Sequence, residues 1–221
     1  VTARKFFGQE DHLFLLMSST REEARLSAEF HFKENGVRRV TAIHDQRNLA
    51  YTESWLREFT SAFQDLGGEV FPIAYESGQE VSFGSVVQIA LSKQPDAVLM
   101  ITSAVDAARF AQKVRERNPR ILLIASQWAA TERLVELGGE SVEGMVLHNY
   151  FDRASTAPGL VKLRDLYVQR FLREPGFSGV AAYDATIILL TALARRPNGE
   201  TLRETLLTRG PFPGAEGEIA F

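Results

Sequence analysis

The 221-residue sequence contains no cysteine and only 4 histidines. Without cysteine there is no disulfide, no thiolate nucleophile and no cysteine-ligated metal, and thiol usage indicates no compartment. The histidines show neither i, i+4 pairing nor H-E-x-x-H spacing, so a metal site has little support. No glycine-rich phosphate loop and no G-x-S-x-G elbow occur. We therefore expect no catalytic nucleophile, no metal and no cofactor.

An excess of charge is also missing, since 25 Lys+Arg face 28 Asp+Glu for a net charge of −3. This balance attracts neither nucleic acid nor an anionic membrane, and we expect neither as a partner. The longest apolar runs, Ala97–Ile101 and Ile121–Ala125, fall well short of the roughly 18 residues of a membrane span, so no direct membrane insertion is expected. Because the first residue is Val1, the chain looks excerpted or processed.

What is present is an alternation of short apolar, β-branched runs with segments of helical period. Strands are predicted to start near residues 40, 69, 97, 121 and 144. This spacing is typical of successive βα units in a parallel sheet. A helix opening on the capping-box pattern Thr20–Glu23 precedes the first strand. Residues 19–150 are thus predicted to form one α/β domain whose strands are buried on both faces.

The pattern changes after Tyr150. A polar linker leads to helices predicted over Leu160–Leu172, Val180–Arg195 and Thr201–Leu207, and a Pro/Gly-rich stretch then leads to a strand at 217–221. Because no strand is predicted between Tyr150 and Pro211, these helices lack a sheet of their own. They either cap the first domain or belong to a second lobe whose strands lie elsewhere.

Polar and aromatic residues follow the predicted strands. In an open α/β sheet, ligands bind beyond the carboxyl ends of the strands. Tyr51, Ser103, Gln127 and Trp128 fall at these ends, where hydroxyl and amide groups would bind a small polar solute between aromatic walls. Two alternatives stay open: that Ser103 only caps the helix that contains Asp106, and that the two aromatics are only packing residues.

Several segments, in their order and spacing, carry a family resemblance. They are Gly36–Asp45, Ala50-Tyr51, Leu66–Val70, Gln94–Val98, Asp106–Phe110, Gly139–Gly144, Ala182–Ala185 and Gly214–Phe221. Over nearly the whole chain, this series resembles the type I periplasmic binding proteins, in particular the leucine/isoleucine/valine-binding receptors of ABC transporters.

The resemblance implies a Rossmann-like parallel-sheet lobe plus helices of a second, incomplete lobe. Residues 1–18 would be a crossover segment, 19–150 the second lobe, 151–210 helices returning to an incomplete first lobe, and 211–221 a crossover with the start of a strand returning to the second lobe. Tyr51 matches the tyrosine of the family's A-Y-G motif, although Thr52 replaces the glycine. The family's second aromatic is missing at Ala104, and its ammonium-pairing acid is replaced by Gln127.

The function implied is that of a bacterial periplasmic or extracellular solute-binding domain. It would not be an enzyme; it would capture an amino acid or related ligand between two lobes for ABC-type uptake, with a membrane permease or a sensor as partner. Two alternatives remain: the ligand-sensing domain of a membrane receptor or signalling protein, and an α/β enzyme. The enzyme would depend on the only ionisable cluster predicted at the strand ends, His44, Asp45 and Glu53.

Overall fold

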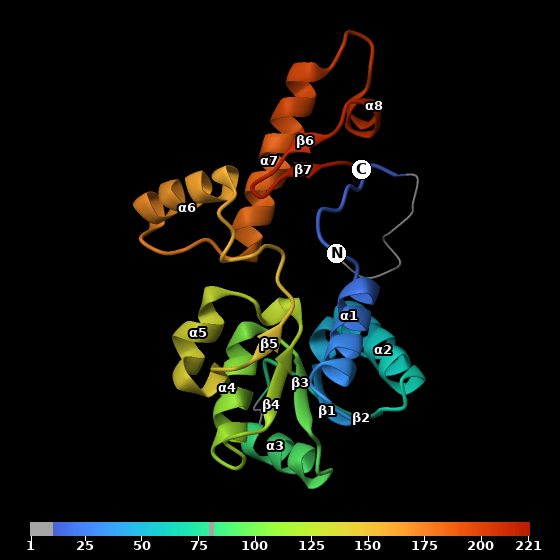
Figure 1. Cartoon of the computed structure of the whole chain (residues 1–221), viewed down its shortest axis with the longest axis vertical. Helices are drawn as coiled ribbons and strands as arrows, with labels where there is room; N and C mark the ends of the chain where they lie inside the picture. Colours follow the sequence, from blue (N-terminus) through green and yellow to red (C-terminus); the bar gives the residue numbers. More distant parts are fainter. Residues whose placement is uncertain (1–10, 80–81) are drawn as a thin grey trace. The chain divides into compact units, whose positions relative to one another are not determined.

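The computed structural model of the chain describes residues 11–79 and 82–221 (Figure 1). These residues form two compact units. Unit 1 comprises Ser18–His148, and unit 2 comprises residues 11–17 together with Asn149–Phe221. Most of the crossover segment predicted over 1–18 lies outside the described residues.

Unit 1 is built on a parallel five-stranded sheet with the strand order β2-β1-β3-β4-β5. The strands are β1 (Arg39–Asp45), β2 (Glu69–Tyr75), β3 (Ala97–Ile101), β4 (Leu122–Ala125) and β5 (Val146–Leu147). The predicted α/β fold class with successive βα units is confirmed, and β3 has the bounds predicted for it, Ala97–Ile101.

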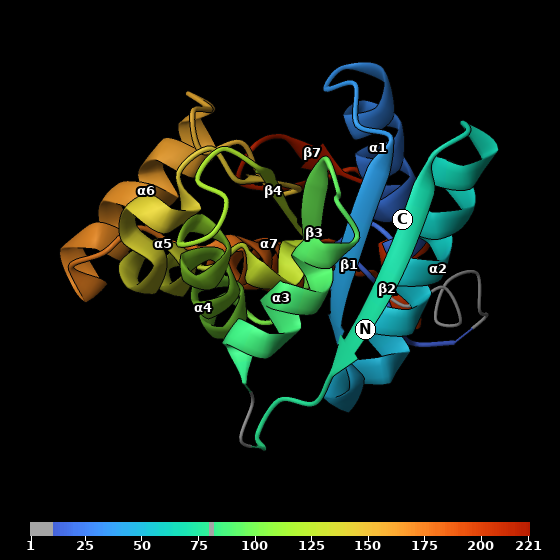
Figure 2. The same cartoon turned by 90° about the horizontal axis from the view of Figure 1, so that it is seen from below.

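Helices cover both faces of this sheet (Figure 2). The helices α1 (Thr20–Lys33) and α2 (Leu49–Asp65) pack on one face, and α3 (Phe83–Ser92), α4 (Ala104–Arg115) and α5 (Glu132–Gly138) pack on the other. Short 3₁₀ turns, η2 (Gln46–Asn48), η3 (Gln127–Ala129) and η4 (Gly139–Val142), follow β1, β4 and α5.

Successive side chains of a strand point to opposite faces of the sheet, and this alternation divides the core of unit 1 into two layers. In β3, Leu99 and Ile101 pack with α1 and α2, whereas Met100 packs with α3 and α4. On the α2 side, the rings of Trp55 and Phe59 stack with centroids 5.4 Å apart, and Phe63 continues the stack from Phe59 at 5.3 Å. These three aromatics, spaced four residues apart, therefore form the central ridge of that layer.

Two sequence-based expectations about unit 1 are wrong in detail. The strand β2 is not buried on both faces, because it is the edge strand and exposes Pro72. Proline is tolerated there because an edge position needs fewer ladder donors. The capping box is made by Ser19 and Glu22 rather than by Thr20, whose hydroxyl is buried 2.7 Å from that of Ser54. This contact fastens the start of α1 to α2.

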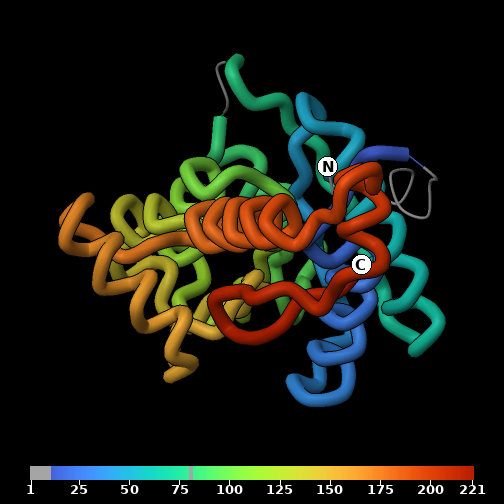
Figure 3. Tube along the Cα trace, turned by 90° about the horizontal axis from the view of Figure 1, so that it is seen from above, coloured from blue at the N-terminus to red at the C-terminus, as the bar shows by residue number. Residues whose placement is uncertain are grey.

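Unit 2 consists of three helices and a small hairpin. The helices are α6 (Pro158–Phe171), α7 (Phe177–Arg195) and α8 (Leu202–Thr208), and the antiparallel strands are β6 (Phe212–Pro213) and β7 (Glu218–Ile219). The hairpin runs beside α7 (Figure 3). The strand predicted at 217–221 forms β7 within unit 2, and its partner β6 was not predicted because it spans only two residues.

The hairpin loop is joined to α7 through one buried carboxylate. Asp184 of α7 accepts a 2.6 Å hydrogen bond from the backbone N–H of Ala215 and a 2.9 Å hydrogen bond from the hydroxyl of Tyr150. Burial and this carboxylate together raise the pKa of the Tyr150 hydroxyl. One side chain thus connects three separate parts of unit 2.

Helix α7 corrects the statement that no segment reaches the length of a membrane span. It has 19 residues and contains an 18-residue window with a mean hydropathy of 1.6, which is enough to cross a membrane by length and composition alone. The sequence shows no continuous apolar run of this length, because polar residues such as Asp184 and Thr186 interrupt the apolar sequence of the helix. In unit 2, Val180 packs with α6, and Ile188 and Ala192 pack with α8 and β6.

Candidate functional site

The carboxyl ends of β1, β3 and β4 lie at one edge of the unit 1 sheet. The register pairs His44 with Ile101 and Met100 with Ala125, so the residues that follow these strands emerge side by side. The backbone N–H of Ser126 then donates to the carbonyl of Met100, which ties the turn η3 to β3. This edge carries the four residues predicted as ligand contacts.

Tyr51 and Trp128 are brought together at this edge. Tyr51 lies in the first turn of α2 and Trp128 in η3, and their rings meet edge to face with centroids 5.9 Å apart. Both side chains are half-buried. The two aromatics therefore pack on each other and still present part of their surface, as a ligand wall requires.

The hydroxyl of Tyr51 points into the protein rather than to solvent. It is a buried atom without a hydrogen-bond partner, as is the hydroxyl of Ser126. Burial raises the pKa of Tyr51, and the charge of Glu23 raises it further. The nearby Ser126 hydroxyl and Trp128 backbone oppose this rise, although neither forms a hydrogen bond with the Tyr51 hydroxyl. Tyr51 can thus offer a ligand its ring but not its hydroxyl.

Ser103 caps α4, which is the structural role that the sequence left open for it. Its hydroxyl oxygen accepts a 3.3 Å hydrogen bond from the backbone N–H of Asp106. The Asp106 carboxylate in turn accepts from the hydroxyl of Tyr75 at 2.8 Å. Ser103 is half-buried, and its own hydroxyl proton is not engaged by this cap, so it can still donate to a ligand.

Gln127 is the most enclosed of the four predicted contacts, with 4% of its surface exposed. Its backbone N–H donates a 2.7 Å hydrogen bond to the carboxylate of Glu23 on α1. The sequence marks Glu23 only as the acid of a capping-box pattern, because its partner in the fold lies 104 residues away and no local motif joins them.

Glu23 is a buried acid, with 1% of its surface exposed. Burial raises its pKa from 4.5 to about 7, although the N–H of Gln127 and the indole of Trp55 oppose the rise. Among the described residues no cation forms an ion pair with it. Its carboxyl group therefore changes charge near neutral pH.

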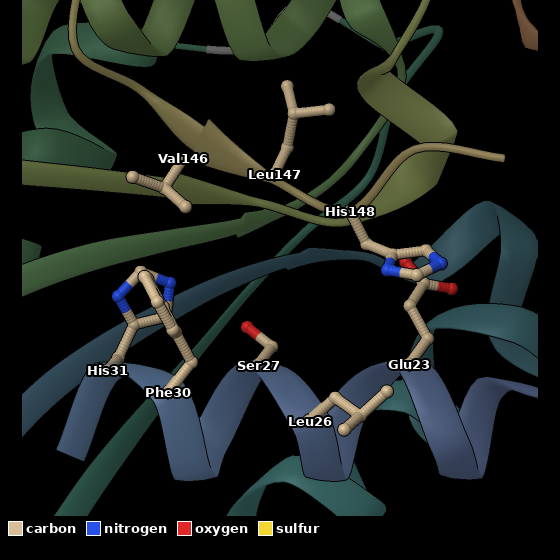
Figure 4. Close-up of a pocket in the computed structure, with 8 residues that line it drawn as sticks. All are labelled: Glu23, Leu26, Ser27, Phe30, His31, Val146, Leu147 and His148. Carbon is tan, nitrogen blue, oxygen red and sulfur yellow. The ribbon is translucent and has the colours of Figure 1, made fainter. Parts of the chain in front are cut away.

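Glu23 also borders a cavity of about 180 Å³ between α1 and β5, shown in Figure 4. Glu23 and His148 lie at one end of the cavity, and Phe30 and His31 lie at the other. Burial lowers the pKa of His31 to about 4 and also lowers that of His148. At neutral pH the cavity is thus lined by two neutral imidazoles and one titrating acid.

Of the residues on which an enzyme would depend, Asp45 has another task in the fold. Asp45 caps η2 by accepting from the N–H of Arg47 at 3.0 Å, and it also accepts from the backbone and hydroxyl of Ser77. Burial lowers the pKa of His44, against the opposing charges of Glu53 and Asp45. Within residues 11–79 and 82–221, no cluster of three acids or histidines could hold a metal.

The fold and this sheet edge agree with the comparison to known families. A model of a family described as periplasmic binding protein matches residues 7–221. The chain belongs to this periplasmic binding protein family, and the resemblance found in the sequence is confirmed.

Solved structures of this fold include proteins that are named for a ligand or were solved with one bound. Leucine binding protein LivK from Thermotoga maritima is similar over 93% of this chain and 59% of its own, with 26% identity and a TM-score of 0.82. LivJ from Streptococcus pneumoniae, solved with isoleucine, is similar over 96% of this chain and 60% of its own, with 16% identity and a TM-score of 0.84.

A third structure carries a different ligand. An ABC-transporter solute binding protein from Rhodopseudomonas palustris, solved with 3,4-dihydroxybenzoic acid, covers 93% of this chain and 57% of its own, at 19% identity and a TM-score of 0.77. The chain thus spans less than two thirds of each of these three structures. No curated protein matches the chain.

Proposed function

We propose that the chain is the greater part of a solute-binding protein, which captures a small polar ligand between two lobes for ABC-type uptake. The observation that carries the proposal is the aromatic pair Tyr51 and Trp128 at the carboxyl edge of the unit 1 sheet. Ligands of open α/β sheets bind at this edge, and membership of the periplasmic binding protein family supports the same role.

The proposed ligand contacts are Tyr51 and Trp128 as walls and Ser103 and Gln127 as hydrogen-bonding groups. Gln127 supplies an amide where the family resemblance implies an acid for the ligand's ammonium group. Replacing a charge-assisted hydrogen bond with a neutral one costs about 1–2 kcal/mol. We therefore propose an amino acid derivative or a related polar compound, rather than a plain branched-chain amino acid.

Unit 1 is proposed to be the second lobe, and the helices of 151–210 are proposed to belong to the first lobe. Leu189, Leu190 and Leu193 of α7 are large apolar side chains that remain exposed in the chain. An exposed apolar helix face favours packing against a further layer. Because the solved relatives are longer, such a layer is available in proteins of this family.

The proposed setting is extracytoplasmic, in the bacterial periplasm or outside the cell, with a membrane permease as partner. A non-enzymatic role fits this setting, since the family consists of ligand binders. It also fits the state of Asp45, whose carboxylate is committed to three hydrogen bonds. A sensor would use the same ligand site with a different partner.

Replacing Tyr51 with alanine tests the site. Loss of a buried aromatic contact at the centre of a binding site typically costs 2 kcal/mol or more, so we expect affinity to fall by at least about 30-fold. Isothermal titration calorimetry on the full-length protein measures this, with a panel of L-leucine, L-isoleucine, L-glutamine and 3,4-dihydroxybenzoic acid as probes.

The matched control is Tyr51→Phe. Because the Tyr51 hydroxyl is buried without a partner, this variant should bind within about threefold of the wild type and be at least as stable. The site assignment is wrong if Tyr51→Ala binds the best probe as tightly as the wild type does. A panel in which no probe and no further small solute binds would instead count against the function.

A further inference from the structure

The buried carboxylate of Glu23 holds a turn that the proposed ligand site depends on. Glu23 Oε1 accepts a 2.7 Å hydrogen bond from the backbone N–H of Gln127, the first residue of η3. The next residue is Trp128, whose ring meets that of Tyr51. The contact on Glu23 is thus one residue away from the aromatic wall.

Helix α1 presents Glu23 from a fixed position. Its capping box at Ser19 and Glu22 begins the helix directly before Glu23. Ala24 and Ala28 on the same helix are fully buried against α2 and the sheet. Because α1 cannot shift without disturbing this packing, the carboxylate is a rigid anchor for the turn.

The turn has few other hydrogen bonds to the rest of unit 1. Its start is joined to β3 by the hydrogen bond from Ser126 N to Met100 O, and the remaining backbone bonds of η3 are internal to the turn. The Ser126 hydroxyl has no partner. Ala129 at the end of η3 is buried in the core beside α4, so removing the bond to Glu23 loosens the part of the turn that carries Gln127 and Trp128 rather than the whole turn.

We propose that Glu23 is a positioning residue for the ligand site, whose carboxylate fixes the Gln127–Ala129 turn and so places Trp128 against Tyr51. The inference rests on the proposed function only in assigning that aromatic pair to a ligand. The positioning itself is a property of the ligand-free protein.

The arrangement makes the position of Trp128 depend on pH. An ionised carboxylate accepts a stronger hydrogen bond than a protonated one, so the turn is held more tightly above the Glu23 pKa of about 7 than below it. The titratable groups around Glu23 are Tyr51 on α2, His148 at the same end of the cavity, and His31 at the other end of the cavity. Burial lowers the pKa of both histidines, which favours their neutral forms.

Nuclear magnetic resonance tests each link without any ligand. The amide proton of Gln127 reports the contact with Glu23. Fluorine resonances of 5-fluorotryptophan report the two tryptophans, with Trp128 assigned from a Trp128→Phe variant. In the wild type we expect both reporters to titrate with a common midpoint near pH 7.

Two variants separate charge from contact. Glu23→Gln keeps an oxygen that can accept from Gln127, so Trp128 should stay near its wild-type resonance while the titration disappears. Glu23→Ala removes the acceptor, so the Trp128 resonance should move or broaden at every pH. Glu29→Gln is the control, because Glu29 lies on the same helix and pairs with Lys33 at 3.2 Å; it should leave both reporters unchanged.

Three results would overturn the proposal. Persistence of the titration in Glu23→Gln would assign it to another group, and His148→Gln would then identify the histidine. A Gln127 amide that titrates without any response from Trp128 would show that the contact does not position the ring. An unmoved Trp128 resonance in Glu23→Ala would show the same. None of these outcomes depends on whether a solute binds, so failure of the proposed function remains distinguishable.

Discussion

Replacing Phe59 with alanine is expected to lower the free energy of unfolding of unit 1 by about 3–5 kcal/mol, the usual cost of deleting a buried aromatic side chain. Phe59 is fully buried, and its ring stacks on Trp55 at 5.4 Å and on Phe63 at 5.3 Å. The substitution therefore opens a cavity in the layer between α2 and the sheet. Chemical denaturation followed by tryptophan fluorescence measures the change, and the thermal midpoint should fall by roughly 10 °C.

The control for this variant is Phe30→Ala on α1. The Phe30 side chain is 47% exposed, so the same chemical change should cost less than about 1 kcal/mol. If the two variants lost equal stability, the stack would not be the central packing element that the structure indicates.

The second large effect is expected at Asp184 in unit 2. Asp184→Ala removes the acceptor for the Ala215 N–H and for the Tyr150 hydroxyl, and it leaves both donors unpaired in partly or fully buried positions. Hydrogen bonds to a charged group contribute about 1.5–3 kcal/mol each, so the loss should be about 3 kcal/mol. Hydrogen exchange measures it directly, since the Ala215 amide should exchange about 100-fold faster.

Asp165→Ala is the matched control, because Asp165 is exposed on α6. It should leave the exchange of the Ala215 amide unchanged. Unaltered exchange in Asp184→Ala itself would mean that β6 and β7 hold the loop without the carboxylate.

Much of unit 1 could be predicted because each βα unit has a recognisable pattern within a short stretch of sequence. The strand Ala97–Ile101 is a continuous apolar run between polar segments, and the spacing of Trp55, Phe59 and Phe63 follows the helical period. Local signals also identified Ser103 as the possible cap of α4, a role that the structure shows. The family followed from the order of such segments along the chain.

The parts that could not be predicted depend on distant partners or on side-chain direction. The two-residue strand β6 contains Pro213 and forms only because β7 returns beside it. In the sequence, Glu23 has the pattern of an ordinary acid in the first turn of a helix, and only the fold places the backbone N–H of Gln127 against it. The inward direction of the Tyr51 hydroxyl is set by the packing around it, and a pattern of residue types does not predict it.

That inward hydroxyl determines how the proposed site can discriminate among solutes. A wall that offers only ring surface recognises the shape and apolar area of a ligand, and one added or missing methylene against such a wall changes binding by only about 1–3 kcal/mol. Compounds that share a flat or branched apolar face should therefore compete for Tyr51 and Trp128 with similar strength. At the proposed aromatic wall, a set of related solutes would then be accepted, and a change of preferred solute during evolution would not require a new aromatic pair.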